Sequence, residues 1–187
     1  MNRNYLSVLI VLLLLSGCEK NRSPIACFTF PHDKVITNTV VAPDNCSENA
    51  SEYLWDDGNG NQYTDFEPVF TYQDPGKYLV SLIAYTEDGE EQHMVTDSVE
   101  VNVPTGKVTF WQNGSIQYSP QVKVTIGSQT ETITNYYPNG ISTCDMAGCA
   151  NFTLPVGSYN YHAWSGTTSW DNTVDIEQGK CFKMQLR

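Results

Sequence analysis

The chain has 187 residues, a length that allows one domain or two small ones. It carries 10 Lys and Arg residues against 21 Asp and Glu residues, for a formal net charge of −11 at pH 7. This charge argues against nucleic-acid binding and against an electrostatic attachment to anionic lipid, because both need clustered Lys and Arg. We therefore expect no nucleic-acid partner.

The N-terminus has the pattern of an export signal. Arg3 precedes an apolar run over residues 5–15, which is too short to cross a bilayer, since a spanning helix needs about 20 residues. Residues 15–18 read Leu-Ser-Gly-Cys, which resembles a bacterial lipobox. The resemblance implies that residues 1–17 are a lipoprotein signal peptide and that Cys18 carries the lipid. An ordinary secretory signal is the alternative, and it would leave Cys18 without a purpose.

A lipid on Cys18 would make the membrane a partner of this chain. Acyl chains such as palmitate anchor firmly, because each buried CH₂ contributes about 0.8 kcal/mol. Glu19 follows the cysteine, where an Asp is usually associated with retention in the inner membrane, so we expect the outer membrane. The sequence leaves open whether the protein faces the periplasm or the cell surface. Residues 18–23 would form a short lipidated tether.

The first strands of the chain contain two cysteines. Residues 25–30 and 39–42 predict strands, and residues 33–37 predict a turn between them. Antiparallel pairing about a turn near residues 36–37 places Cys27 directly opposite Cys46, which predicts a disulfide. A register slip of one residue would turn the two thiols to opposite faces and leave both free.

Residues 53–85 predict a strand, a glycine-rich turn, a second turn and a long strand. Trp55 ends the first strand, Asp, Gly and Asn residues fill positions 56–60, and apolar residues alternate from 78 to 84. The segment resembles a PKD (polycystic kidney disease) domain, an immunoglobulin-like β-sandwich. The motif residues are Trp55, Asp56, Gly58, Gly60, Pro68, Thr71, Tyr72, Pro75, Gly76, Tyr78, Val80 and Leu82. The resemblance covers residues 24–103.

Two residues depart from the PKD pattern. Asp57 stands where the family usually has Phe, and Asn59 stands where it usually has Asp. The first change removes an apolar side chain beside the turn, and the second weakens any interpretation of that loop as a metal site. Residues 87–91 form an acidic hairpin tip, and carboxylates at such a tip are usually solvated. We expect no metal and no cofactor.

Pro104, Thr105 and Gly106 mark a domain boundary, so that residues 106–187 form a second domain. Seven short strands are predicted there, over residues 107–111, 122–126, 130–136, 150–154, 159–163, 173–176 and 182–186. Residues 154–159 read Leu-Pro-Val-Gly-Ser-Tyr, which resembles carboxypeptidase-regulatory or transthyretin-like sandwiches. Such modules occur in surface proteins of the Bacteroidetes group. The expected fold class is all-β, with two tandem small β-sandwiches.

Three cysteines remain in the second domain. Cys144 and Cys149 bracket a four-residue loop, and Cys181 opens the last strand. We favour a disulfide between Cys144 and Cys149, because it would fix a loop that has little else to hold it. Pairing of Cys181 with either of the other two stays open.

The chain has no motif for catalysis. His32, His93 and His162 are scattered, and none has metal-ligand spacing or a neighbouring nucleophile motif. The paired acids Asp56 and Asp57 lie in a turn, where carboxylates bond local backbone groups. A small hydrolase is therefore disfavoured, and we expect no catalytic residue.

Aromatic residues gather in the second domain. Trp164, Trp170, Tyr136 and Tyr137 are candidate ligand-facing residues, because exposed rings stack on sugar faces. Packing in the core is the alternative, and the exposure of the two tryptophans decides between them. We expect a surface-anchored, non-catalytic binding or spacer module in adhesion or other protein or carbohydrate contacts. The alternative is a glycan-binding accessory protein of a polysaccharide-uptake system.

Overall fold

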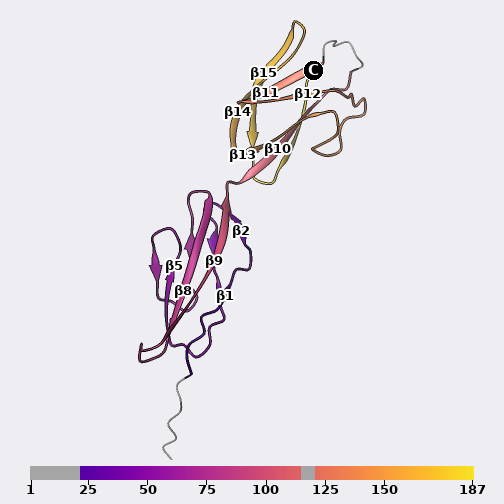
Figure 1. The fold of residues 1–187 in the computed structure, drawn as a ribbon. Helices are drawn as coiled ribbons and strands as arrows, with labels where there is room; N and C mark the ends of the chain where they lie inside the picture. The colour runs from indigo at the N-terminus through magenta and orange to yellow at the C-terminus, as the bar shows by residue number, and fades with distance from the viewer. Residues whose placement is uncertain (1–21, 115–120) are drawn as a thin grey trace, which may run out of the picture. The chain divides into compact units, whose positions relative to one another are not determined.

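The computed structural model describes residues 22–114 and 121–187 (Figure 1). The expected signal peptide over residues 1–17 and the expected lipid site at Cys18 lie outside the described residues, as does most of the tether. Within the described ranges every regular element is a β-strand, which confirms the all-β fold class. No helix there could cross a membrane.

The described residues pack into two compact units. The first comprises residues 22–31, 41–70 and 78–98, and the second comprises residues 32–40, 71–77 and 99–187. The β-sheets divide the chain at a different point, between residues 102 and 105. None of the described sheets combines a strand before this point with a strand after it. Residues 22–103 and residues 104–187 therefore each have their own sheets.

The sheets of residues 22–103 enclose an aromatic and aliphatic core. The largest has five strands, in the order β2 (Lys34–Ile36), β9 (Gln92–Asn102), β8 (Gly76–Tyr85), β5 (Glu52–Asp56) and β6 (Gln62–Tyr63). Two short pairs join β1 (Phe28–Thr29) to β4 (Asp44–Asn45) and β3 (Val40–Val41) to β7 (Phe70–Thr71). Val80, Leu82 and Ala84 of β8 are fully buried with Trp55 and Phe70, because alternate residues of a strand share one face.

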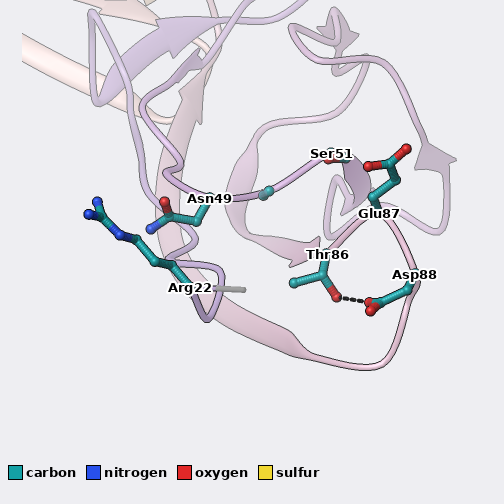
Figure 2. Close-up of a pocket in the computed structure, with 7 residues that line it drawn as sticks. Arg22, Asn49, Ser51, Thr86, Glu87 and Asp88 are labelled. Carbon is teal, nitrogen blue, oxygen red and sulfur yellow. Dashed lines mark hydrogen bonds between the residues drawn. The ribbon is translucent and has the colours of Figure 1, made fainter. Parts of the chain in front are cut away.

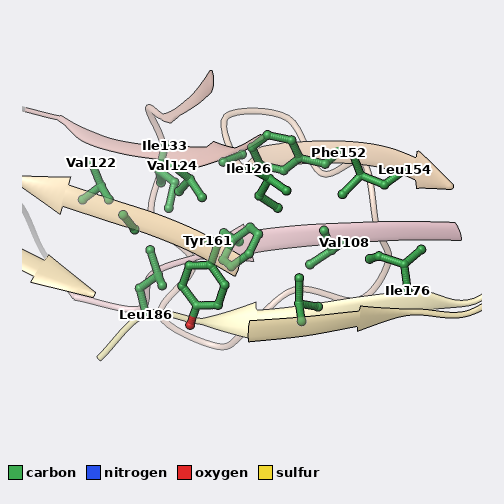
Figure 3. Packing of buried hydrophobic residues seen from close by; sticks show 14 residues of the cluster. Val108, Val122, Val124, Ile126, Ile133, Phe152, Leu154, Tyr161, Ile176 and Leu186 are labelled. Carbon is green, nitrogen blue, oxygen red and sulfur yellow. The ribbon is translucent and has the colours of Figure 1, made fainter. Parts of the chain in front are cut away.

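Residues 104–187 form two sheets. One has the order β13 (Ala150–Pro155), β10 (Thr105–Trp111) and β16 (Cys181–Gln185), with β16 parallel to β10. The other has the order β12 (Gln129–Ile133), β11 (Val122–Ile126), β14 (Gly157–Ser165) and β15 (Thr168–Ile176). All seven predicted strands are present. Side chains of both sheets, among them Phe152 and Tyr161, meet in one apolar core (Figure 3). Phe110 packs edge-on against both of these rings.

Cys27 and Cys46 form a disulfide with their Cα atoms 4.8 Å apart, the pairing expected from the sequence. The register beside it follows the expected ladder, since Phe28 faces Asn45 and Ile25 bridges to Glu48. The connection is not a simple hairpin, however. Between the two strands β2 pairs in parallel with β9, and β3 pairs with β7.

The second disulfide differs from the favoured one. Cys144 is joined to Cys181, with the Cα atoms 5.9 Å apart, and Cys149 is a free, buried thiol. The cause is the parallel pairing of β10 with β16, which places Cys181 opposite Lys107 at the sheet position against which the 144–149 loop lies. Burial raises the pKa of the Cys149 thiol, so it is a poor nucleophile in the folded chain.

Candidate functional site

The outer face of the three-stranded sheet is covered by the loop over residues 141–149. Thr109 points outward from β10 yet is only 1% exposed, because the backbone N–H of Asp145 donates to its hydroxyl at 3.1 Å. The amide of Asn151 donates to the carbonyl of Met146 at 3.0 Å, and Lys107 pairs with Asp145. The Cys144–Cys181 disulfide holds this loop against the sheet. The loop therefore covers the middle of this face around Thr109, while Lys107, Thr153 and Lys183 stay exposed.

The outer face of the four-stranded sheet is not covered in this way. Val122, Val124 and Ala163 point into the core (Figure 3), so that residues between them point outward. We call nine of the outward residues, those around Trp164 and His162, the open face; they are Lys123, Thr125, Thr130, Thr132, Asn160, His162, Trp164, Ser169 and Asp171. All nine are exposed or half-buried. Ser158, Thr173 and Asp175 point outward farther along the β14–β15 hairpin.

An aromatic pair lies at the centre of the open face. The rings of His162 and Trp164 stack, with centroids 5.1 Å apart and planes inclined by 19°. They are two residues apart on β14, so that they share one side of the strand. Asp171 faces His162 across the β14–β15 ladder, and its carboxylate lies 2.6 Å from Nδ1 of His162. This carboxylate fixes the orientation of the imidazole ring, and the imidazole supports one side of the indole.

Hydroxyl and ammonium groups surround the aromatic pair. Lys123 and Ser169 are the cross-strand neighbours of Trp164, and Thr125 is the neighbour of His162. The hydroxyls of Thr125 and Thr130 hydrogen-bond each other at 2.7 Å. The open face therefore combines the stacked rings of His162 and Trp164 with a rim of hydrogen-bonding groups.

The structure separates the four aromatics that the sequence grouped as ligand-facing. Only Trp164 lies on the open face. Trp170 faces Ala163 on the opposite side of the sheet, packs against the core, and donates from its indole nitrogen to the carbonyl of Arg187. Both tryptophans are half-buried, but they cannot form one platform, because they lie on opposite faces. Of the two tryptophans, only Trp164 stays a candidate for contact with a ligand at the open face.

The two tyrosines belong to the connection that follows β12. The backbone N–H of Tyr137 donates to the carbonyl of Gln112 at 2.9 Å, and its hydroxyl donates to the carbonyl of Ala147. Tyr137 therefore ties together the loops beside the three-stranded sheet. Tyr136 is also half-buried. The sequence analysis missed His162 and Asp171, although the two-residue spacing of His162 and Trp164 in an alternating strand was a usable signal.

In residues 22–103, Asp57 organises the glycine-rich turn. It is 1% exposed and accepts four hydrogen bonds: from the backbone N–H groups of Asn59 and Asn61 at 2.8 and 3.1 Å, from the Asn61 amide at 2.8 Å, and from the Tyr63 hydroxyl at 3.3 Å. Burial by itself would raise the pKa of this carboxyl, but the hydrogen bonds outweigh it and lower the pKa below its ordinary value. The position that lacks the usual Phe holds a satisfied buried anion, which is structural rather than chemical in role.

A shallow hollow of about 590 Å³ lies beside the acidic hairpin tip (Figure 2). Arg22 and Asn49 line one side, and Thr86, Glu87 and Asp88 line the other. The Thr86 hydroxyl donates to Asp88 at 2.6 Å, and this bond, with one from the backbone of Glu90, lowers the pKa of the Asp88 carboxyl. The Asp88 carboxylate is therefore hydrogen-bonded within its own turn.

The histidines and acids do not assemble into a reactive site in the part of the chain that the structure describes. There, no group of three or more His, Cys, Asp or Glu residues could hold a metal ion. His93 accepts a hydrogen bond at Nδ1 from the backbone N–H of Ala26 at 2.9 Å, which is a structural role. His162 belongs to the open face.

Comparison with known proteins identifies the first part of the chain. Residues 21–103 match the family model of the PKD domain, so the chain contains a PKD domain over this range. Collagenase ColQ1 of Bacillus cereus (strain Q1) is 28% identical over 94 residues, which are 48% of this chain and 9% of the collagenase. The chain therefore spans less than a tenth of the length of that curated relative.

Solved structures give further similarities. The PKD1 domain of Vibrio anguillarum Epp is 28% identical, with a TM-score of 0.40, and the match covers 46% of this chain and 100% of that domain. A structure of carbohydrate-binding modules from the β-sandwich superfamily is 20% identical, with a TM-score of 0.45, over 77% of this chain and 59% of that one.

Proposed function

We propose that this chain is a non-catalytic binding module, held at the outer membrane by a lipid on Cys18, that contacts a protein or a carbohydrate. The PKD domain over residues 21–103 supports a modular role, because the resemblance implies contact with a protein or a carbohydrate rather than chemistry. The lipobox-like residues 15–18 support the anchor.

The observation that carries the proposal is the contrast between the two sheets of residues 104–187. The middle of one outer face is covered by a disulfide-held loop, while the other has no such loop over the stacked pair of Trp164 and His162. A half-exposed tryptophan leaves apolar area in water, and burying that area against a partner is favourable. The open face is therefore the surface at which we place the contact.

A glycan-binding accessory protein of a polysaccharide-uptake system is the second candidate. It is favoured by the rim of the open face, where Thr125, Thr130 and Ser169 offer hydroxyl groups beside the indole. Sugars present the same combination of an apolar ring face and a hydroxyl edge. An adhesion or spacer role does not require hydroxyl groups beside an indole.

Two measurements test the proposal. The first is metabolic labelling with palmitate, followed by fractionation of membranes, for the full chain and for Cys18→Ser. We expect label and sedimentation with outer membranes for the first protein only. Equal labelling of both proteins, or recovery of the unaltered chain in the soluble fraction, would contradict the anchor.

The second measurement is binding of the detergent-solubilised full chain to two arrays, one of glycans and one of surface proteins. We expect retention by members of one array. A chain that binds neither array would refute the assignment as a binding module, and hydrolysis of a substrate in a general glycosidase or peptidase screen would refute its non-catalytic part.

A further inference from the structure

We infer that the ligand of the open face is a neutral polysaccharide with a sugar ring stacked on the face of the Trp164 indole that His162 does not cover. This inference rests on the proposed function, since it names the ligand of the same binding module. It is carried by three properties of the open face: an indole held in a fixed orientation, surrounding hydroxyl groups, and little positive charge.

The indole of Trp164 is held in one orientation before any ligand binds. Trp164 is supported on one side by the His162 ring at 5.1 Å, and His162 is fixed in turn by Asp171 at 2.6 Å. The two rings differ in orientation by only 19°. A ring that is already oriented loses little conformational freedom on binding, which favours affinity.

The rim suits a sugar better than a protein. Thr125, Thr130, Thr132 and Ser169 supply hydroxyls, Asn160 supplies an amide, and Asp171 supplies an acceptor. Each can exchange hydrogen bonds with the hydroxyl groups at the edge of a pyranose ring. The open face has no Leu, Ile, Val, Met or Phe, whereas the centre of a protein interface is rich in large apolar residues around its anchors.

Charge selects a neutral polymer over an anionic one. Lys123 is the only Lys or Arg among the nine residues of the open face, and Asp171 lies on the same face. The whole chain has a net charge of −11. A polyanion would therefore be repelled over most of its approach.

The test uses the detergent-solubilised full chain and its variants in affinity electrophoresis against neutral polymers (α-glucan, β-glucan, mannan and xylan) and one polyanion (polygalacturonate). Trp164→Ala removes the stacking ring. Ser169→Arg keeps the indole of Trp164 but places a long side chain beside it, because Ser169 is its cross-strand neighbour. Position 169 is exposed and tolerates a long side chain. Trp164→Phe keeps a smaller ring. Phe66→Ala is the matched control, because it removes a 49% exposed aromatic from residues 22–103.

We expect one or more neutral polymers to bind, with affinity about tenfold lower or worse in Trp164→Ala and Ser169→Arg, since an aromatic anchor contributes much of the energy of a small contact. Trp164→Phe should lie between these variants and the unaltered chain, and Phe66→Ala should bind normally. Circular dichroism identifies any variant that does not fold, in which case the remaining variants decide.

The failures of the two proposals are distinguishable. Binding of a neutral polymer that neither Trp164→Ala nor Ser169→Arg weakens would overturn the site and leave the binding module. Binding of polygalacturonate alone, or of a protein alone, would overturn the ligand class and also leave the binding module. A chain that binds no polymer and no surface protein would overturn both.

Discussion

Replacing Asp57 with Ala should selectively destabilise the PKD domain. The carboxylate accepts four hydrogen bonds within the turn over residues 57–63, and the two shortest, from the Asn59 backbone and the Asn61 amide, are both 2.8 Å. At about 1.5 kcal/mol for each of these two bonds to a charged group, the loss is about 3 kcal/mol. The two longer bonds add little, because Asn61 is exposed and its backbone can bond water instead.

Amide hydrogen exchange measured by mass spectrometry resolves this effect in the intact chain. A loss of about 3 kcal/mol should speed exchange in β8 roughly 100-fold, because the most protected amides exchange through global opening of their own domain. The peptide over β14 is the internal reference, since it belongs to a separate sheet. The two peptides can be followed in the same digest.

The matched control for this change is Asp56→Ala. The Asp56 carboxylate accepts a single exposed bond, from the Gly58 backbone N–H at 2.8 Å, so its loss should have an effect smaller than about 1 kcal/mol. Equal effects of the two substitutions on β8 would refute the reasoning, because they would show that the buried network around Asp57 contributes nothing beyond an ordinary turn.

Three further predictions follow from the same structure. Because the folded-state pKa of Asp57 is lowered, its contribution to stability is present above the ordinary carboxyl pKa of about 3.9 and is lost as pH falls through the folded-state value; protection of β8 should therefore fall more steeply below about pH 4 in the unaltered chain than in Asp57→Asn, and parallel curves would contradict this. Gly58→Ala should lower the melting temperature more than Gly60→Ala, since both glycines have positive φ but only at position 58 would the new Cβ lie 2.5 Å from the Leu79 carbonyl oxygen; equal melting temperatures would count against the close approach. A non-reducing peptide map should show Cys144 linked to Cys181, with Cys149 alkylated only after denaturation, and Cys144→Ser should lose about 3–4 kcal/mol in the chain-entropy model; a Cys144–Cys149 peptide would contradict the structure.

Local alternation predicted most of the strands because it depends only on neighbouring residues. Val80, Leu82 and Ala84 are buried as their spacing indicated, and so are Val122 and Val124. The Cys27–Cys46 pairing was also predictable, since a ladder register follows from one pair of facing residues. The route of the chain between those cysteines was not, because β2 pairs with residues 66 positions later in β9 and β3 pairs with β7, both outside the β1–β4 pair.

The open face depended on a hairpin that the sequence analysis did not recognise. Strands were predicted over residues 159–163 and 173–176, which left both tryptophans in a connection. In the structure Ser165 faces Thr168 across a two-residue turn, and Gly166 has a φ of 57°. Glycine in such a turn is a hairpin signal. With it, the ladder places Trp164 and Trp170 on opposite faces of the sheet.

The link between Cys144 and Cys181 spans 37 residues of sequence, whereas Cys149 lies much closer to Cys144 along the chain. During synthesis the thiol at 149 is made before the native partner at 181. An oxidant that acts early therefore meets the wrong pair first, and the trapped bond must be exchanged before β16 can settle beside β10. Correct maturation of this chain thus favours late oxidation or a shuffling catalyst, and replacing the spare thiol with Ala should remove that dependence.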